Sequence, residues 1–269
     1  MTVTAAPARS LDAEQLRHYQ EDGFVIVRGV LTPDLVEAYK QRARQFALGE
    51  LPPGGEKMVV KEVRVAKGLV KPDDPEKGIW KYLNPDRFDL LFAAYPGQSA
   101  LVDIVEPLLG PDIKAFLMMF IYKPPSLDFV HPYHQDAYYF PFEPHDLCLG
   151  TWLALDRTDA ENGTIAVIRG SHRGPILPHG QPKGDSVNYG VFGVEGFDGH
   201  PDEVTIELDP GDVLLFHSRL LHKTGPNLSQ RHRRVITVHY ASSRCRRTGE
   251  HHQAIAFKLV RGQSYDGCI

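Results

Sequence analysis

The second half of the chain consists of short segments rich in β-branched and aromatic residues, and no other feature restricts the possible fold as strongly. Turn-forming residues such as Pro124-Pro125, Asn162-Gly163 and Pro210-Gly211 separate these segments. Many short strands joined by turns are typical of a β-sandwich or a closed barrel. The predicted strands are Ile113–Tyr122, Leu149–Leu155, Thr164–Ile168, Val204–Leu208, Asp212–Phe216 and Val235–Tyr240.

The first half of the chain has helical patterns instead. Thr32-Pro33 places an N-capping residue before a proline, a combination typical of the first turn of a helix. We predict helices over about 11–22, 33–49, 85–94 and 99–109, and strands over about 24–27 and 58–65. Residues 1–10 are expected to form a flexible tail, and residues 11–269 a single domain. The predicted fold class is mainly β, with N-terminal helices that buttress a sheet.

Charge and composition argue against several classes of protein. The chain has 30 Lys and Arg residues against 34 Asp and Glu residues, so it lacks the positive charge that nucleic-acid binding requires. Its longest apolar run, Ala115–Tyr122, is far too short to cross a membrane. Three scattered cysteines do not suggest a disulfide framework, and residues 1–10 do not resemble a signal peptide. We therefore expect a cytoplasmic protein, and no feature indicates its oligomeric state.

His134 and Asp136 form the most informative pair of residues. In an extended segment alternate side chains point to the same side, so this imidazole and this carboxylate can bind one metal ion together. A second histidine would complete the ligand set of non-haem Fe(II) oxygenases, which is two histidines and one carboxylate. The leading candidate is His222, 86 residues after Asp136, and Arg233 follows it by 11 residues.

Several stretches of the sequence resemble the phytanoyl-CoA dioxygenase family of Fe(II)- and 2-oxoglutarate-dependent oxygenases. They occur in the order that the family has, and the similarity covers most of the chain. The stretches are YKPP (122–125), HPYHQDAYYFPF (131–142), NG (162–163), GSHRG (170–174), PGDVLLFH (210–217) and LLHKTGPN…RRVITVHYA (220–241).

The resemblance implies a double-stranded β-helix, which is a cupin-like jelly roll. It implies that Fe(II) is bound by His134, Asp136 and His222. Arg233 would bind the distal carboxylate of 2-oxoglutarate, since a guanidinium pairs well with a carboxylate. Further contacts to this co-substrate are implied for Lys61, Met119, Trp152 and Thr224. The implied reaction uses O2 to hydroxylate an unactivated C–H bond of a small-molecule substrate, and it releases succinate and CO2.

Some assignments stay open when only the residues are considered. His217 competes with His222 as the third metal ligand, although its apolar neighbours in sequence also suit a packed core histidine. Arg234 competes with Arg233, because both faces of this predicted strand carry apolar residues. Residues expected near the substrate are His131, Tyr138 and Tyr139.

The sequence does not select one substrate. The namesake of the family acts on a branched acyl-CoA, and other members act on amino acids and natural products. The resemblance therefore implies an acyl-CoA, an amino-acid-like compound or a natural product as the substrate. The basic residues Arg244, Arg246 and Arg247 suit either the phosphates of a CoA substrate or a solvated surface. The glycine-rich loop at 178–201 is long enough to be a lid that helps to select the substrate. Alternative functions are a cupin-type metalloenzyme that does not use 2-oxoglutarate, and a non-catalytic jelly-roll binding protein.

Overall fold

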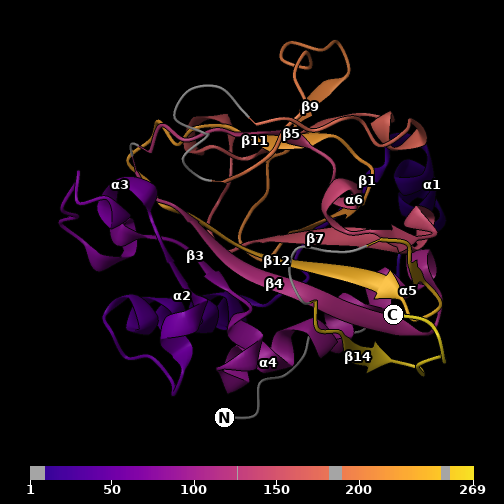
Figure 1. Ribbon diagram of the computed structural model, residues 1–269, viewed down its shortest axis with the longest axis horizontal. Coiled ribbons are helices and arrows are strands. Elements are labelled where there is room, and N and C mark those ends of the chain that lie inside the picture. Colours follow the sequence, from indigo (N-terminus) through magenta and orange to yellow (C-terminus); the bar gives the residue numbers. More distant parts are fainter. Residues whose placement is uncertain (1–9, 126, 182–189, 250–254) are drawn as a thin grey trace.

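Two antiparallel β-sheets face each other in the computed structural model, which describes residues 10–125, 127–181, 190–249 and 255–269 (Figure 1). The larger sheet has the strand order β1-β10-β7-β12-β4-β3-β2, with β14 also paired to β4. The smaller sheet has the order β5-β11-β8-β9. This arrangement confirms the predicted fold class, a mainly β, cupin-like jelly roll. Most of the tail predicted at 1–10, and the centre of the loop at 178–201, lie outside the described residues.

The strands are short except for the two at the centre of the larger sheet. In the larger sheet they are β1 Phe24–Val27, β2 Val59–Lys61, β3 Ile79–Leu83, β4 Ile113–Lys123, β7 Cys148–Ala154, β10 Val213–His217, β12 Arg233–Ser242 and β14 Lys258–Arg261. In the smaller sheet they are β5 His131–His134, β8 Ile165–Ile168, β9 Glu203–Thr205 and β11 His222–Thr224. A separate pair is formed by β6 Phe142–Glu143 and β13 Arg246–Arg247.

Helices cover the outer face of the larger sheet and form a third layer, with α2 and α4 below the sheet in Figure 1. Their apolar side chains, such as Tyr39, Phe92 and Val105, share one buried cluster with Phe120 and Ile236 of the sheet. The helices are α1 Ala13–Asp22, α2 Pro33–Ala47, α3 Val63–Ala66, α4 Leu90–Ala94, α5 Ser99–Leu109 and α6 Asp136–Tyr139. No helix among the described residues has the length and apolar character needed to cross a membrane.

Local capping explains where two sequence predictions were wrong. The strand predicted at 58–65 ends at Lys61, because the Glu62 side chain accepts a hydrogen bond from the Val65 N–H and starts α3. The helix predicted at 85–94 is divided, because Asp89 caps a new helix at Leu90. Strand β3 was not predicted at all.

The two sheets are held apart by a second buried cluster, which lies between them. Trp152 and Phe216 of the larger sheet meet Ile165 and Val167 of the smaller sheet in this cluster. Close packing here fixes the separation of the sheets, and any residue that points into the gap is thereby placed against the opposite sheet.

A pair of buried histidines lies outside this gap, where α1 meets β10. The rings of His172 and His217 are 5.2 Å apart, and His217 Nε2 lies 3.1 Å from Asp146 Oδ1. Burial lowers the pKa of His217 to about 4, and it lowers the pKa of His172 as well. The unfolded chain therefore binds protons at His217 from about pH 6.5 downward, whereas the folded chain does not until about pH 4.

This difference predicts that the free energy of unfolding falls as the pH is lowered from about 6.5 toward 4, by up to roughly 1.4 kcal/mol per pH unit for each such group. His217→Gln should reduce the fall, and His18→Gln, which changes an exposed histidine of α1, should not. Urea unfolding at pH 7.5 and pH 5 measures the effect. An equal pH dependence of the wild type and His217→Gln would contradict the prediction.

Candidate active site

The pairing of β5 with β11 brings two histidines together across the smaller sheet. His134 is the last residue of β5, His222 is the first residue of β11, and the two are partners in the antiparallel register. Their ring centroids are 4.1 Å apart, and both side chains are buried. Strand pairing thus brings His134 and His222 together, although they are 88 positions apart in sequence.

Asp136 lies close to the two histidines, but it belongs to a helix and not to a strand. Its Oδ1 atom is 3.9 Å from His134 Nε2 and 3.8 Å from His222 Nε2. His134 and Asp136 were expected on one face of an extended segment, and this detail was wrong. The strand ends at His134, and Asp136 is already the first residue of α6.

Gln135, between the two, stabilises this sharp change of direction. Its Nε2 atom donates hydrogen bonds to the carbonyls of Pro175 and Arg219, and its Oε1 accepts one from the Leu177 N–H. These three bonds satisfy a side chain that is only 1% exposed. Gln135 therefore anchors the turn that carries Asp136 back toward the histidines.

Backbone carbonyls select the tautomer of both histidines. His134 Nδ1 lies 2.9 Å from the Pro132 carbonyl, and His222 Nδ1 lies 2.9 Å from the Leu220 carbonyl. Because a carbonyl oxygen can only accept, each Nδ1 carries the hydrogen, and each Nε2 presents a lone pair. Burial, and then the neighbouring His222, lower the pKa of His134 to about 3, so its ring is neutral at ordinary pH.

Asp136 is held by a fourth side chain. Its Oδ2 atom lies 3.0 Å from His239 Nε2, which leaves Oδ1 facing His134 and His222. Burial alone would raise the pKa of Asp136, but the attraction of His239 and His222 outweighs it and holds this pKa well below its ordinary value. Asp136 is therefore a carboxylate, the form that binds cations.

These donor atoms suit a divalent metal ion. The ligand atoms of His134, Asp136 and His222 all lie within 4.8 Å of one another. Two atoms bound to one ion at about 2.1 Å can be no more than about 4.2 Å apart, and the 3.8 and 3.9 Å separations meet this limit. Two imidazoles and one carboxylate on one side of an ion leave its other side open.

A cavity of about 120 Å³ lies between the sheets, and these three residues and Arg233 all line it. Arg233 is 1% exposed, and its Nε atom has no hydrogen-bond partner among the described residues. Its guanidinium lies over the ring of Trp152, 5.5 Å from the centroid. Burial lowers the pKa of Arg233 to about 9. A buried guanidinium without a bound carboxylate is suited to bind an anion.

Two lysines that the sequence analysis did not single out also line this cavity. Lys81 comes from β3, and burial lowers its pKa to about 8. Lys123, at the end of β4, donates hydrogen bonds to Thr224 Oγ1 at 3.0 Å and to the carbonyls of Phe129 and Gly225. Burial, and then the neighbouring Arg233, lower the pKa of Lys123 well below its ordinary value.

Lys61, which was predicted to bind the co-substrate, is not brought into the site. Its side chain is exposed at the end of β2, the edge strand of the larger sheet, and it does not line the cavity. Lys81 of the adjacent strand β3 lines it instead. The lysine at the cavity is therefore not Lys61 of β2 but Lys81 of the neighbouring strand β3. The signal that could have corrected it is the apolar and aromatic stretch Ile79–Leu83, which contains Lys81.

The other residues predicted near the co-substrate or substrate lie close to the metal ligands. Met119, Trp152 and Thr224 line the cavity. His131 also lines it and stacks on His134, with centroids 4.2 Å apart and an interplanar angle of 13°.

The two predicted tyrosines lie farther out. Tyr139 meets the edge of His134 at 6.0 Å, and its hydroxyl donates to the Phe192 carbonyl. Tyr138 is 40% exposed and stacks on His179, which in turn accepts a hydrogen bond from the Gln135 N–H.

The alternatives left open by the sequence lie elsewhere. His217 is bonded to Asp146 and does not join the metal-binding cluster. Arg234 points to the opposite face of β12, where it pairs with Asp156 and Glu76. Of the basic run, Arg244 pairs with Asp112, whereas Arg246 and Arg247 are exposed on β13.

Removal of a donor atom from the cluster should abolish tight metal binding. We expect His222→Ala to weaken anaerobic Co(II) binding by more than the ~10–100-fold that loss of an outer-sphere partner typically costs. His217→Gln should stay within about threefold of the wild type, because its ring contacts Asp146 instead. Visible absorption during a Co(II) titration measures both. The opposite order of effects would show that His217 is the third ligand.

Comparisons with known proteins agree with this geometry. The family model described as phytanoyl-CoA dioxygenase (PhyH) matches residues 19–235. The chain is 33% identical to the peroxisomal phytanoyl-CoA dioxygenase of Rattus norvegicus, over 88% of this chain and 70% of that protein. It is also 33% identical to a probable phytanoyl-CoA dioxygenase of Caenorhabditis elegans, over 86% of this chain and 76% of that protein.

Solved structures share the fold at lower identity. The non-heme monooxygenase ThoJ superposes with a TM-score of 0.68 and 22% identity, over 94% of this chain and 85% of that chain. EctD from S. alaskensis, solved with 2-oxoglutarate and 5-hydroxyectoine, gives 0.67 and 19%, over 88% of this chain and 78% of that chain. The chain belongs to the phytanoyl-CoA dioxygenase family, and it is a dioxygenase that uses iron and 2-oxoglutarate together with O2.

Proposed function

We propose that the protein hydroxylates an unactivated C–H bond of an aliphatic, acyl-type small molecule, and that succinate and CO2 are released. His134, Asp136 and His222 would hold Fe(II) in this proposal. The observation that carries it is the cavity itself, which is lined both by the three metal-binding side chains and by the buried guanidinium of Arg233, whose Nε atom has no hydrogen-bond partner among the described residues. Family membership argues against both a metalloenzyme without 2-oxoglutarate and a non-catalytic binding protein.

The cationic end of the cavity suits one carboxylate of 2-oxoglutarate. Arg233 can donate two parallel hydrogen bonds to a carboxylate, which fixes its orientation. Lys81, which lines the same cavity, adds a second donor. Lys123 already donates to Thr224 and to backbone carbonyls, so we assign it to holding Thr224 and the end of β11 in place.

Apolar walls strengthen these interactions. Met119, Ile121 and Trp152 line the same cavity as the metal ligands and Arg233. They exclude water, and in a dry site the attraction between a guanidinium and a carboxylate is stronger than at the surface. Iron and 2-oxoglutarate, when bound, supply the activation of O2. The contribution of this chain is to orient the co-substrate and to keep water away from the reacting centre.

The proposed substrate class rests on the cavity wall and on the relatives. Trp80 and Phe129 form an apolar, edge-to-face aromatic pair that lines the cavity near His131. The relatives at 33% identity are named for phytanoyl-CoA, and a hydroxylase of Streptomyces arenae at 28% identity is named for 1-deoxypentalenic acid. An acyl group or a carboxylic acid on an apolar skeleton is the chemistry that these two names share.

The two lysines provide a matched test of the co-substrate site. Lys81→Met should raise the dissociation constant of 2-oxoglutarate roughly 10- to 100-fold, because a charged hydrogen bond contributes about 1.5–3 kcal/mol. Lys61→Met should leave it unchanged, since Lys61 is exposed outside the cavity. The measurement is an anaerobic titration of the Fe(II) protein that follows the metal-to-ligand charge-transfer band. A larger effect of Lys61→Met would contradict the assignment of Lys81.

The substrate class is tested with a branched acyl-CoA and with the corresponding free acid. One of them should give a product heavier by one oxygen atom, with one succinate formed for each product molecule, as measured by mass spectrometry. Arg233→Met should lose both products together, because it removes the co-substrate contact. Succinate at the background rate with both compounds would contradict the acyl-type substrate while leaving the co-substrate site untouched.

A further inference from the structure

His239 of β12 connects the metal-binding cluster to the centre of the larger sheet. Its Nε2 atom lies 3.0 Å from Asp136 Oδ2, and its Nδ1 atom lies 3.3 Å from the Leu117 carbonyl. The ring is 6% exposed and packs against Phe140 at 4.8 Å and Phe116 at 5.7 Å. Neither a carboxylate nor a carbonyl oxygen can donate, so in this geometry His239 donates from both ring nitrogens, from Nε2 to Asp136 and from Nδ1 to Leu117.

Leu117 has a backbone conformation that is unusual for leucine. Its φ angle is +46°, in the left-handed region that is unfavourable for residues with a Cβ atom. The strand register shows the reason, because Val238 pairs with Met118 whereas His239 pairs with Phe116. Leu117 is therefore the extra residue of a β-bulge in β4. Such bulges are frequent beside active sites, where they redirect nearby groups.

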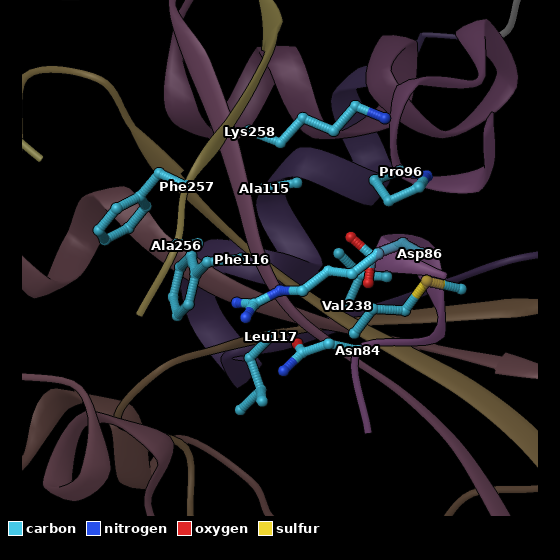
Figure 2. Close-up of a pocket in the computed structure, with 12 residues that line it drawn as sticks. Asn84, Asp86, Pro96, Ala115, Phe116, Leu117, Val238, Ala256, Phe257 and Lys258 are labelled. Atoms are coloured by element: carbon cyan, nitrogen blue, oxygen red, sulfur yellow. The ribbon is translucent and has the colours of Figure 1, made fainter. Parts of the chain in front are cut away.

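The outer edge of β4 leaves space for this bulge. Strand β3 pairs with Met119–Ile121 of β4, and β14 pairs with Ile113–Ala115, so neither strand forms a ladder with Leu117. A cavity of about 230 Å³ occupies the gap. Figure 2 shows Leu117 and Asn84 along one side of this cavity and Lys258 on the opposite side. The Leu117 carbonyl is thus turned toward His239 without breaking a pairing with β3 or β14.

We propose that His239 is a positioning residue for Asp136, and that the bulge at Leu117 sets the orientation of its ring. The proposal rests on the ligand set proposed above. With Oδ2 held by His239, Asp136 offers Oδ1 alone to a metal ion, at 3.9 Å from His134 Nε2 and 3.8 Å from His222 Nε2. Without this bond the carboxylate could turn and present both oxygens, which would occupy a position that the co-substrate or O2 needs.

The test uses anaerobic Co(II) binding and its visible spectrum, without co-substrate or turnover. His239→Leu should weaken binding ~10–100-fold and change the ligand-field bands, as loss of an outer-sphere partner does. His239→Gln, whose amide can donate to Asp136, should restore part of the affinity. His217→Leu is the matched control, because it removes a buried histidine that bonds a carboxylate away from the site. It should keep the wild-type affinity and spectrum.

A second pair of variants tests the bulge. Leu117→Asn keeps a residue that tolerates positive φ, so it should bind Co(II) within about threefold of the wild type. Leu117→Val favours extended backbone, so it should weaken binding in the same direction as His239→Leu. These variants also keep the proposal testable if His239→Leu does not fold, as judged by circular dichroism.

Three failures are distinguishable. Wild-type affinity and spectrum in His239→Leu, beside impaired binding in His134→Ala, would overturn the positioning role alone. Wild-type binding in His134→Ala would overturn the ligand set, and the positioning role with it. Equal Co(II) affinities of Leu117→Asn and Leu117→Val would overturn the part assigned to the bulge.

Discussion

The antiparallel pairing of β5 with β11 is the contact on which the site depends. It makes His134 and His222 register partners, and both strands belong to the sheet that packs across the gap from Trp152. Asp136 reaches the same point only because the chain leaves β5 at once and enters α6, where Gln135 anchors the turn. A shift of one residue in this register would move a histidine to the other face of its strand and separate the three donor atoms.

The gap between the sheets has an uneven distribution of charge. Among the described residues, Arg233, Lys81 and Lys123 line the same cavity as a single carboxylate, Asp136, which is already bonded to His239. Burial of cations without anions is unfavourable, so a molecule that brings a carboxylate to Arg233 and Lys81 relieves a cost that folding alone leaves in place. Binding of 2-oxoglutarate should therefore be coupled to the stability of the folded chain, since a ligand that binds only the native state stabilises it.

How far the sequence predicts the molecule depends on whether a feature is local. The helices at 33–47 and 99–109 and the central strands follow from capping and from apolar runs, and the jelly roll follows from the order of the motifs. The approach of His134, Asp136 and His222 was expected from ligand chemistry and family resemblance. Lys81 and His239 were not singled out, because the apolar stretch Ile79–Leu83 around Lys81 was not predicted to be a strand and nothing near His239 in the chain marks it. The place of Lys81 depends on the pairing of β3 between β2 and β4, and the orientation of His239 depends on a bulge in the strand next to its own.

The hydrogen bonds that orient His134 and His222 come from the carbonyls of Pro132 and Leu220, which are main-chain groups. A point substitution exchanges side chains and leaves these acceptors in place. The walls of the cavity can therefore diverge, through changes at positions such as Trp80, Ile121 or Phe129, while the imidazoles keep their tautomers. The metal centre can therefore be conserved while the substrate specificity changes. Directed evolution of new specificities can accordingly sample many substitutions in the cavity wall.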